Sequence, residues 1–287
     1  MEYAIEVSNL TKHYKDFTLD HISFQIPKGS VVGMIGENGA GKSTTIKAIL
    51  NLICPEEGKI KVLGEENGAE ERSIKEQIGV VLDESYFPEN LKIPQIAKIM
   101  KNLYQNWENE TFLEYCKKFS LSTEKTYKEF SKGMKMKLSI AVALSHQTKL
   151  LILDEATSGL DPVVRNEILD IFLDFVQEED HTVFLSSHIT SDIEKIADYI
   201  LLIHDGKCLL FEEKDLLIYE YGMVHCREDQ VKKLNQKEIL GMRKNAFETE
   251  VLVKNRRELE QKNRELIVDR VSIEDILLYM VKGQKED

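Results

Sequence analysis

The sequence predicts an α/β fold in which helices wrap a mixed, largely parallel β-sheet. Short, almost uninterrupted apolar runs, typical of strands buried on both faces, occur at 31–35, 78–82, 150–153, 182–186 and 199–203. Stretches with the spacing of amphipathic helices lie between several of these runs. Strands that alternate with helices pair in parallel, because each helix carries the chain back to the same end of the sheet.

The composition narrows the class of protein. With 287 residues the chain can form a full α/β core and a smaller additional domain. The formal net charge of −12, from 50 acidic and 38 basic residues, argues against a general nucleic-acid-binding surface, and we expect no nucleic-acid partner. No apolar stretch is long enough to cross a bilayer, residues 1–20 lack the layout of a signal peptide, and the 4 cysteines show no metal-binding or disulfide spacing.

The beginning of the chain is predicted to contain short strands around one helix. Segments 3–7 and 22–26 alternate apolar and polar side chains, as half-buried strands do. Another strand is expected at 59–63, after a turn-forming segment. The run 31–35 is followed by a helix from about Lys42, because apolar residues recur at the spacing of one helical face: Ile46, Ile49, Leu50 and Ile53.

Beyond this region the pattern alternates between helices and strands. The charged segment 64–77 is expected to be a loop, and 94–145 has the apolar spacing of helices inserted between two strands. A further helix is expected at 162–177 and a last strand at 207–211. Residues 212–287 are nearly neutral and less clearly organised, apart from a final amphipathic helix that Ser272 is placed to cap.

The segment 36–44, reading GENGAGKST, matches the phosphate-binding pattern Gly-x-x-x-x-Gly-Lys-Ser/Thr. It connects a buried strand to a helix N-terminus, where free N–H groups and the helix dipole attract a phosphate. Lys42 can reach the β- and γ-phosphates, and the Ser43 hydroxyl can ligate Mg²⁺. The predicted nucleotide-binding residues of this P-loop are Gly36, Glu37, Asn38, Gly39, Ala40, Gly41, Lys42, Ser43 and Thr44.

Two adjacent acidic residues end the apolar run 150–153. Asp154 is placed to organise Mg²⁺, and Glu155 is placed to polarise the water that attacks the γ-phosphorus. Adjacent carboxylates at the end of an apolar strand repel each other unless a cation is near. This pair therefore predicts a site of phosphate chemistry rather than a structural role.

Further segments resemble the motifs of ABC ATPases, in the family's order. Residues 130–134, reading FSKGM, resemble the LSGGQ signature, although Phe130, Lys132 and Met134 depart from it. Residues 158–161 resemble the D-loop, and a histidine follows the run 182–186 where the family has its switch histidine. The resemblance implies a P-loop NTPase fold of the ABC type, with a cassette over 1–211, a helical signature subdomain over about 88–145 and a C-terminal accessory domain over 212–287.

The resemblance also implies roles for single residues. Ser131, Gly133 and Asp161 would contact nucleotide, and His188 would hydrogen-bond the γ-phosphate and support the catalytic water beside Glu155 and Lys42. Tyr14 stands where the family places an aromatic ring that stacks on adenine; the alternative is a half-buried tyrosine at a strand end.

One position departs from the family pattern. Asp83 occupies the place of a glutamine that touches Mg²⁺, and a carboxylate there can ligate the metal but adds negative charge beside a triphosphate. In the segment that follows, Tyr86, Phe87 and Leu91 either pack against the helical insertion or form a groove for a membrane partner.

The family resemblance implies an ATPase that binds ATP and Mg²⁺. A second cassette would complete each site, forming a homodimer or a heterodimer, and a separate membrane-spanning permease subunit would bind at the cytoplasmic face of the membrane. Likeness to bacterial ABC-2 exporters favours export of a drug, peptide or antibiotic-like substrate. The alternative is a non-transport ABC ATPase of translation or DNA repair, although these carry two cassettes or long coiled coils, and this chain has one P-loop.

Overall fold

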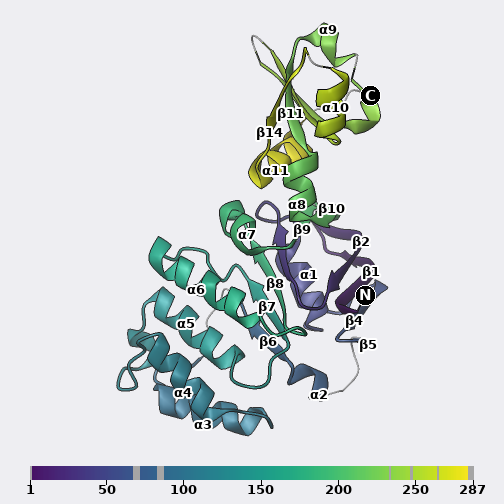
Figure 1. The fold of residues 1–287 in the computed structure, drawn as a ribbon. Helices are drawn as coiled ribbons and strands as arrows, with labels where there is room; N and C mark the ends of the chain where they lie inside the picture. Colours follow the sequence, from purple (N-terminus) through teal and green to yellow (C-terminus); the bar gives the residue numbers. More distant parts are fainter. Residues whose placement is uncertain are drawn as a thin grey trace.

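The computed structural model describes residues 2–66, 72–82, 87–232, 234–245, 248–263 and 265–283. A central sheet lies at the middle of the molecule, with a group of helices at one end and a smaller sheet at the other (Figure 1). Among the described residues, none of the helices combines the length and the apolar character needed to cross a membrane.

The central sheet has 6 strands in the order β10-β9-β3-β8-β7-β6. All neighbouring strands pair in parallel except β9 and β10, which form an antiparallel edge. Mixed pairing of this kind confirms the predicted α/β class. The strands are β3 (Val31–Ile35), β6 (Ile78–Val81), β7 (Leu150–Asp154), β8 (Thr182–Ser187), β9 (Tyr199–His204) and β10 (Lys207–Glu213).

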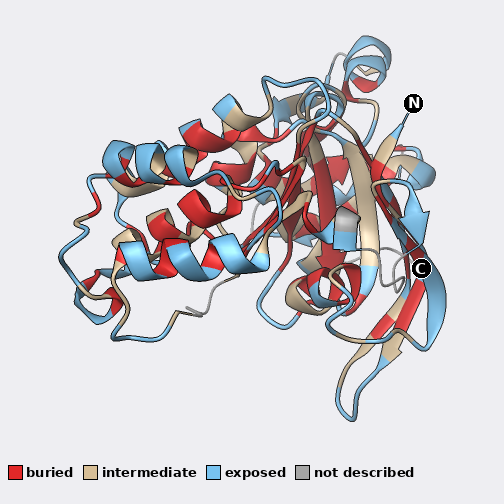
Figure 2. Cartoon of the chain, turned by 90° about the horizontal axis from the view of Figure 1, so that it is seen from below, coloured by how far each residue is buried: buried red, intermediate tan, exposed pale blue. Residues whose placement is uncertain are grey.

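An antiparallel sheet of 4 strands covers one face of the central sheet, with α1 between them. Val32 and Met34 of β3 face this side, and Val31 and Ile35 face the helices on the other side, so the strand is buried on both faces. Figure 2 shows this pattern as buried strands between helices with exposed outer surfaces. The elements are β1 (Tyr3–His13), β2 (Thr18–Pro27), β4 (Glu57–Val62), β5 (Glu65–Glu66) and α1 (Lys42–Ile49).

The predicted helical insertion follows β6. The rings of Phe87 and Tyr127 form a T-shaped pair with 5.6 Å between their centroids, and Leu91 packs on the same core. These two apolar residues therefore pack against the insertion, whereas Tyr86 and Asp83 lie outside the described residues. Helix α2 (Arg72–Lys75) lies before β6, within the segment 64–77 that was expected to be a loop. The helices of the insertion are α3 (Ile93–Leu103), α4 (Asn109–Lys118), η1 (Tyr127–Glu129) and α5 (Lys132–Ala143).

Below these helices, a buried histidine is enclosed by aromatic and polar groups. His146 is 1% exposed, its ring stacks on Tyr104 with 4.0 Å between centroids, and its Nδ1 lies 2.8 Å from the carbonyl oxygen of Glu76. Burial lowers the pKa of His146 below its ordinary value, because the charged imidazolium loses its hydration. The folded protein therefore holds this ring neutral.

We expect this burial to make the fold sensitive to acid. Below the ordinary histidine pKa the unfolded chain binds a proton at His146 that the folded chain does not. The free energy of unfolding therefore suffers no penalty from His146 above about pH 6.5, and it decreases as the pH is lowered through that value. His146→Phe retains an aromatic ring and cannot titrate. Denaturant unfolding at pH 7.5 and pH 5.5 should show a smaller acid loss in the variant than in the wild type. An equal loss would place the acid sensitivity elsewhere.

The C-terminal part folds as an antiparallel sheet of 4 strands in the order β12-β13-β11-β14, called here the C-terminal sheet. The predicted final helix is present, and Ser272 caps it by accepting a hydrogen bond from the Asp275 amide at 3.1 Å. The sheet itself was not anticipated. The strands and helices of the C-terminal part are α8 (Lys214–Glu220), β11 (Gly222–Cys226), α9 (Glu228–Val231), η2 (Gln236–Glu238), β12 (Ile239–Lys244), β13 (Thr249–Val253), α10 (Arg256–Lys262), β14 (Ile267–Arg270) and α11 (Ile273–Lys282).

Candidate nucleotide-binding site

The P-loop joins β3 to α1, as its sequence pattern predicts. Gly41 occupies the N-cap of α1 with φ 112°, a conformation that favours glycine. Gly36 approaches the β9 strand so closely that a Cβ atom there would lie 2.3 Å from the carbonyl oxygen of Ile203. Both positions therefore need glycine, and they fix the curl that directs the N–H groups of the loop and of the first turn of α1 toward one space.

Lys42 lies folded under this loop. Its side chain is 6% exposed, and its Nζ donates hydrogen bonds to the carbonyl oxygens of Gly36 at 2.9 Å and Glu37 at 3.3 Å. The same Nζ lies 3.2 Å from the Glu155 carboxylate. The cation is thus held within the site by acceptors that a phosphate group can replace.

Glu155 follows β7 and lies between two cationic or titratable neighbours. One carboxylate oxygen pairs with Lys42, and the other lies 2.6 Å from Nδ1 of His188. The Glu155 backbone has φ 53°, in the left-handed region, and its amide donates to the Ser186 hydroxyl at 3.1 Å. The three predicted catalytic residues, Lys42, Glu155 and His188, therefore form one connected group.

Asp154 ends β7 and is 7% exposed. Ser186, which pairs with it on β8, donates its hydroxyl hydrogen to the Asp154 carboxylate at 2.5 Å. This hydrogen bond orients the carboxylate and leaves its other oxygen available as a ligand. Carboxylate and hydroxyl oxygens are donors that Mg²⁺ prefers, so Asp154 and Ser43 fit the metal predicted for this site, and Asp83 stays a prediction.

A pocket of about 510 Å³, within the size range of small-molecule sites, opens over the P-loop. A buried lysine, a helix N-terminus and a nearby carboxylate at its floor fit the phosphates of a nucleotide. Tyr14 is not among the lining residues; it lies tilted against Phe17, with 6.5 Å between ring centroids. The pocket is lined by Asp16, Phe17, Asn38, Gly39, Gly41, Lys42, Ser43, Thr44 and Glu155.

Asp16 and Phe17 were missed by sequence analysis. They lie in the turn between β1 and β2, so only the folded antiparallel sheet brings them to the P-loop. Phe17 would also lie 2.9 Å from a Cβ atom at Gly41, which places its ring directly on the loop. The sequence signal that could have identified Phe17 is an aromatic residue shortly before the P-loop, and Phe17 meets this criterion as well as Tyr14 does.

The signature and D-loop residues occupy helix N-termini away from this pocket. Ser131 caps α5 by accepting a hydrogen bond from Met134 N at 3.3 Å, and Asp161 caps α6 (Pro162–Phe175) through the amides of Val163 and Val164 at 3.1 Å. Within the described part of the chain, neither these residues nor Gly133 line the P-loop pocket. Their roles as nucleotide contacts stay predictions.

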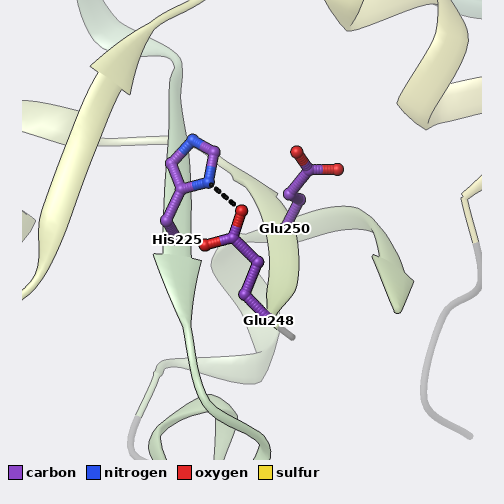
Figure 3. A group of neighbouring side chains, drawn as sticks. All are labelled: His225, Glu248 and Glu250. Carbon is purple, nitrogen blue, oxygen red and sulfur yellow. Dashed lines mark hydrogen bonds and ion pairs between the residues drawn. The ribbon is translucent and has the colours of Figure 1, made fainter. Parts of the chain in front are cut away.

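A second polar cluster lies in the C-terminal sheet. His225 of β11 lies with Nδ1 3.3 Å from Glu248 and Nε2 3.3 Å from Asp269 of β14, and Glu250 of β13 stands directly across the ladder (Figure 3). Burial, together with the hydrogen bond that the hydroxyl of Tyr279 on α11 donates to Glu250 at 2.5 Å, raises the pKa of Tyr279 to about 12. These contacts join three strands and the last helix.

Comparisons with known proteins agree with the geometry. The ABC transporter family matches residues 19–158. The bacitracin transport ATP-binding protein of Enterococcus faecalis is 35% identical over 209 residues, covering 72% of this chain and 68% of that protein. The lantibiotic transport ATP-binding protein of Streptococcus pyogenes is 37% identical over 214 residues, covering 74% and 91%.

A solved structure described as the ATP-binding subunit of an ABC transporter has a TM-score of 0.68 and 27% identity, covering 75% of this chain and 91% of that one. The shared fold, the relatives above 30% identity and the connected group of Lys42, Glu155 and His188 at the P-loop lead to one conclusion. The chain belongs to the ATP-binding proteins of ABC transporters and is an ATPase.

Proposed function

We propose that this chain binds Mg-ATP in the P-loop pocket and, as one of two cassettes, uses its hydrolysis to drive export through a separate membrane-spanning subunit. The observation that carries the proposal is the contact of Glu155 with both Lys42 and His188 at the pocket floor. A lysine that binds phosphate and a carboxylate that orients and deprotonates water are suited to phosphoryl transfer to water, and the histidine holds that carboxylate in place.

The resting contacts support an exchange of partners during the reaction. When phosphates fill the pocket, Lys42 turns from the Gly36 carbonyl and Glu155 toward them, because a multiply charged anion attracts the ammonium more strongly than one carboxylate does. Ser43 and Asp154 would hold Mg²⁺, and the bound ion would supply charge neutralisation on the transferred phosphate. Glu155 is then free to orient and deprotonate a water with one carboxylate oxygen, while His188 holds the other carboxylate oxygen of Glu155.

The arrangement of the signature residues supports action as a pair. Ser131 and Gly133 are not among the residues that line their own chain's pocket, so a second cassette would present them from the other side of the nucleotide. The N-terminus of α5, a helix of 12 residues, is suited to face a phosphate. ABC ATP-binding proteins dimerise and work with membrane permease components; we infer the same here, at the cytoplasmic face of the membrane.

The direction of transport and the kind of cargo are inferred from the relatives. Two of the relatives are named as transport proteins for bacitracin and for a lantibiotic. Because both of these cargoes are antibiotic peptides, the names support export of a peptide, drug or antibiotic-like substrate. We assign the ATPase cassette to residues 1–211 and an accessory domain to 212–287. A role in translation or DNA repair is not favoured, because the relatives are transport proteins.

Transport by the reconstituted complex tests the proposal. The chain is co-expressed with a membrane-spanning partner subunit, purified as a complex and placed in vesicles with fluorescent bacitracin. ATP is expected to drive the fluorescent peptide across the membrane, to the side opposite the ATP-binding chain. Glu155→Gln, which is expected to assemble normally, is the matched negative control. Hydrolysis in a stable complex with no ATP-dependent movement across a panel of peptide antibiotics would contradict the exporter assignment.

A further inference from the structure

The C-terminal helix α11 packs against α7 (Thr190–Ile196), the helix that follows the switch histidine. Ile273 and Ile276 of α11 belong to the same buried cluster as Ile193 and Ile196 of α7. Helix α7 begins two residues after His188. Thus the C-terminal part is attached to the cassette beside the nucleotide site, not at a remote edge.

The end of α11 is fixed in place by close backbone packing on β12. A Cβ atom at Gly241 would lie 2.0 Å from the carbonyl oxygen of Tyr279, and one at Gly283 would lie 2.9 Å from the Gly241 Cα atom. Such approaches are open only to glycine. The helix end therefore has a defined position from which Lys282, its last residue, can reach outward.

Lys282 reaches the P-loop. Its Nζ lies 3.0 Å from a carboxylate oxygen of Glu37, the second residue of the GENGAGKST segment. The backbone of Glu37 supports the loop from inside, since its carbonyl oxygen accepts hydrogen bonds from Ala40 N at 3.1 Å and from Lys42 Nζ at 3.3 Å. One residue thus connects the C-terminal helix to the lysine that binds phosphate.

We propose that Lys282 is a positioning residue of the nucleotide site, through which the C-terminal domain neutralises Glu37 and holds the P-loop in its binding shape. The inference rests on the proposed function, in which this loop binds the phosphates. A free carboxylate at Glu37 would repel an incoming triphosphate, and the ammonium of Lys282 cancels that repulsion. Because the side chains are 58% and 46% exposed, water and salt screen the pair, and its effect on affinity is modest.

Binding of Mg-ATP to the full chain, measured by titration calorimetry at low salt, tests the pair. Lys282→Ala is expected to weaken binding about two- to fivefold, because Glu37 is left unpaired beside the phosphates. Glu37→Gln removes that repulsion, so the double variant should bind ATP as Glu37→Gln alone does. Lys262→Ala is the matched control, since Lys262 is an exposed lysine of the same domain that pairs within α10.

Rescue in the double variant separates charge neutralisation from a general loss of structure, which Glu37→Gln would not repair. The defect of Lys282→Ala should also shrink as salt is raised. Equal affinity of Lys282→Ala and wild type, or a defect that Glu37→Gln leaves unchanged, overturns the inference. If folded Lys42→Ala also binds ATP normally, the proposed nucleotide site itself is wrong; if only Lys42→Ala loses binding, this inference alone fails.

Discussion

Glu155→Gln is expected to slow ATP hydrolysis by about 100-fold or more while ATP binding is retained. The amide keeps the shape of the side chain and a polar contact to His188, but it cannot accept a proton from water or pair as an anion with Lys42. Nucleotide that cannot be hydrolysed should hold two copies of the chain together. Size-exclusion chromatography with Mg-ATP, alongside phosphate release, measures both effects.

Glu258→Gln is the matched control for this variant, because Glu258 pairs with a lysine on the surface of α10, far along the chain from the P-loop. It should hydrolyse ATP as the wild type does. Turnover near the wild-type rate in Glu155→Gln, together with a monomer at every ATP concentration, would exclude Glu155 as the base and remove the basis for a nucleotide-bound dimer.

Lys42→Ala is expected to weaken Mg-ATP binding by about 30-fold or more, the cost of removing one partner from a buried charged interaction. The loss is large because Lys42 is only 6% exposed, so water screens it little. Calorimetry with Mg-ATP measures the affinity. Glu155 keeps His188 as its partner in the variant, so the fold should persist, and a thermal melt checks this.

Lys47→Ala provides the comparison for Lys42→Ala, since Lys47 lies on the exposed side of the same helix. It should bind nucleotide normally and melt at a similar temperature. A folded Lys42→Ala protein with the same affinity as Lys47→Ala would show that the phosphates bind somewhere other than the P-loop.

The strands that carry the site were predictable because they are buried on both faces. Residues 31–35 and 150–153 are continuous apolar runs, and β3 and β7 match them to within one residue. The first strand was underestimated: β1 extends to His13, past the expected end at Val7. Register shifts near Asn9, whose φ is 51°, interrupt the alternation that marks a strand in sequence.

The C-terminal sheet was not predictable from local pattern. β11 pairs with β13 on one side and with β14 on the other, so its partners lie far along the chain, and β14 has only 4 residues. The short helices between these strands give too few turns for an apolar period to emerge. Only the capping signal at Ser272 was local enough to identify α11.

The candidate site was predictable in its members but not in its contacts. Parallel strands place Glu155 and His188 at the same edge as the P-loop, so their proximity follows from the strand order. The pairing of Lys42 with Glu155 depends on side-chain rotamers and on the space under the loop. The contact of Lys282 with Glu37 depends on how the C-terminal part docks, which no motif records.

The left-handed backbone conformation of Glu155 lowers the stability of the fold at a residue that is proposed to act in catalysis. Holding a residue other than glycine at φ 53° costs on the order of 1 kcal/mol, which the surrounding strand contacts must offset. Glycine would relieve that cost but would remove the carboxylate. If Glu155 acts as proposed, selection for a more stable chain would therefore lead away from catalysis at this position.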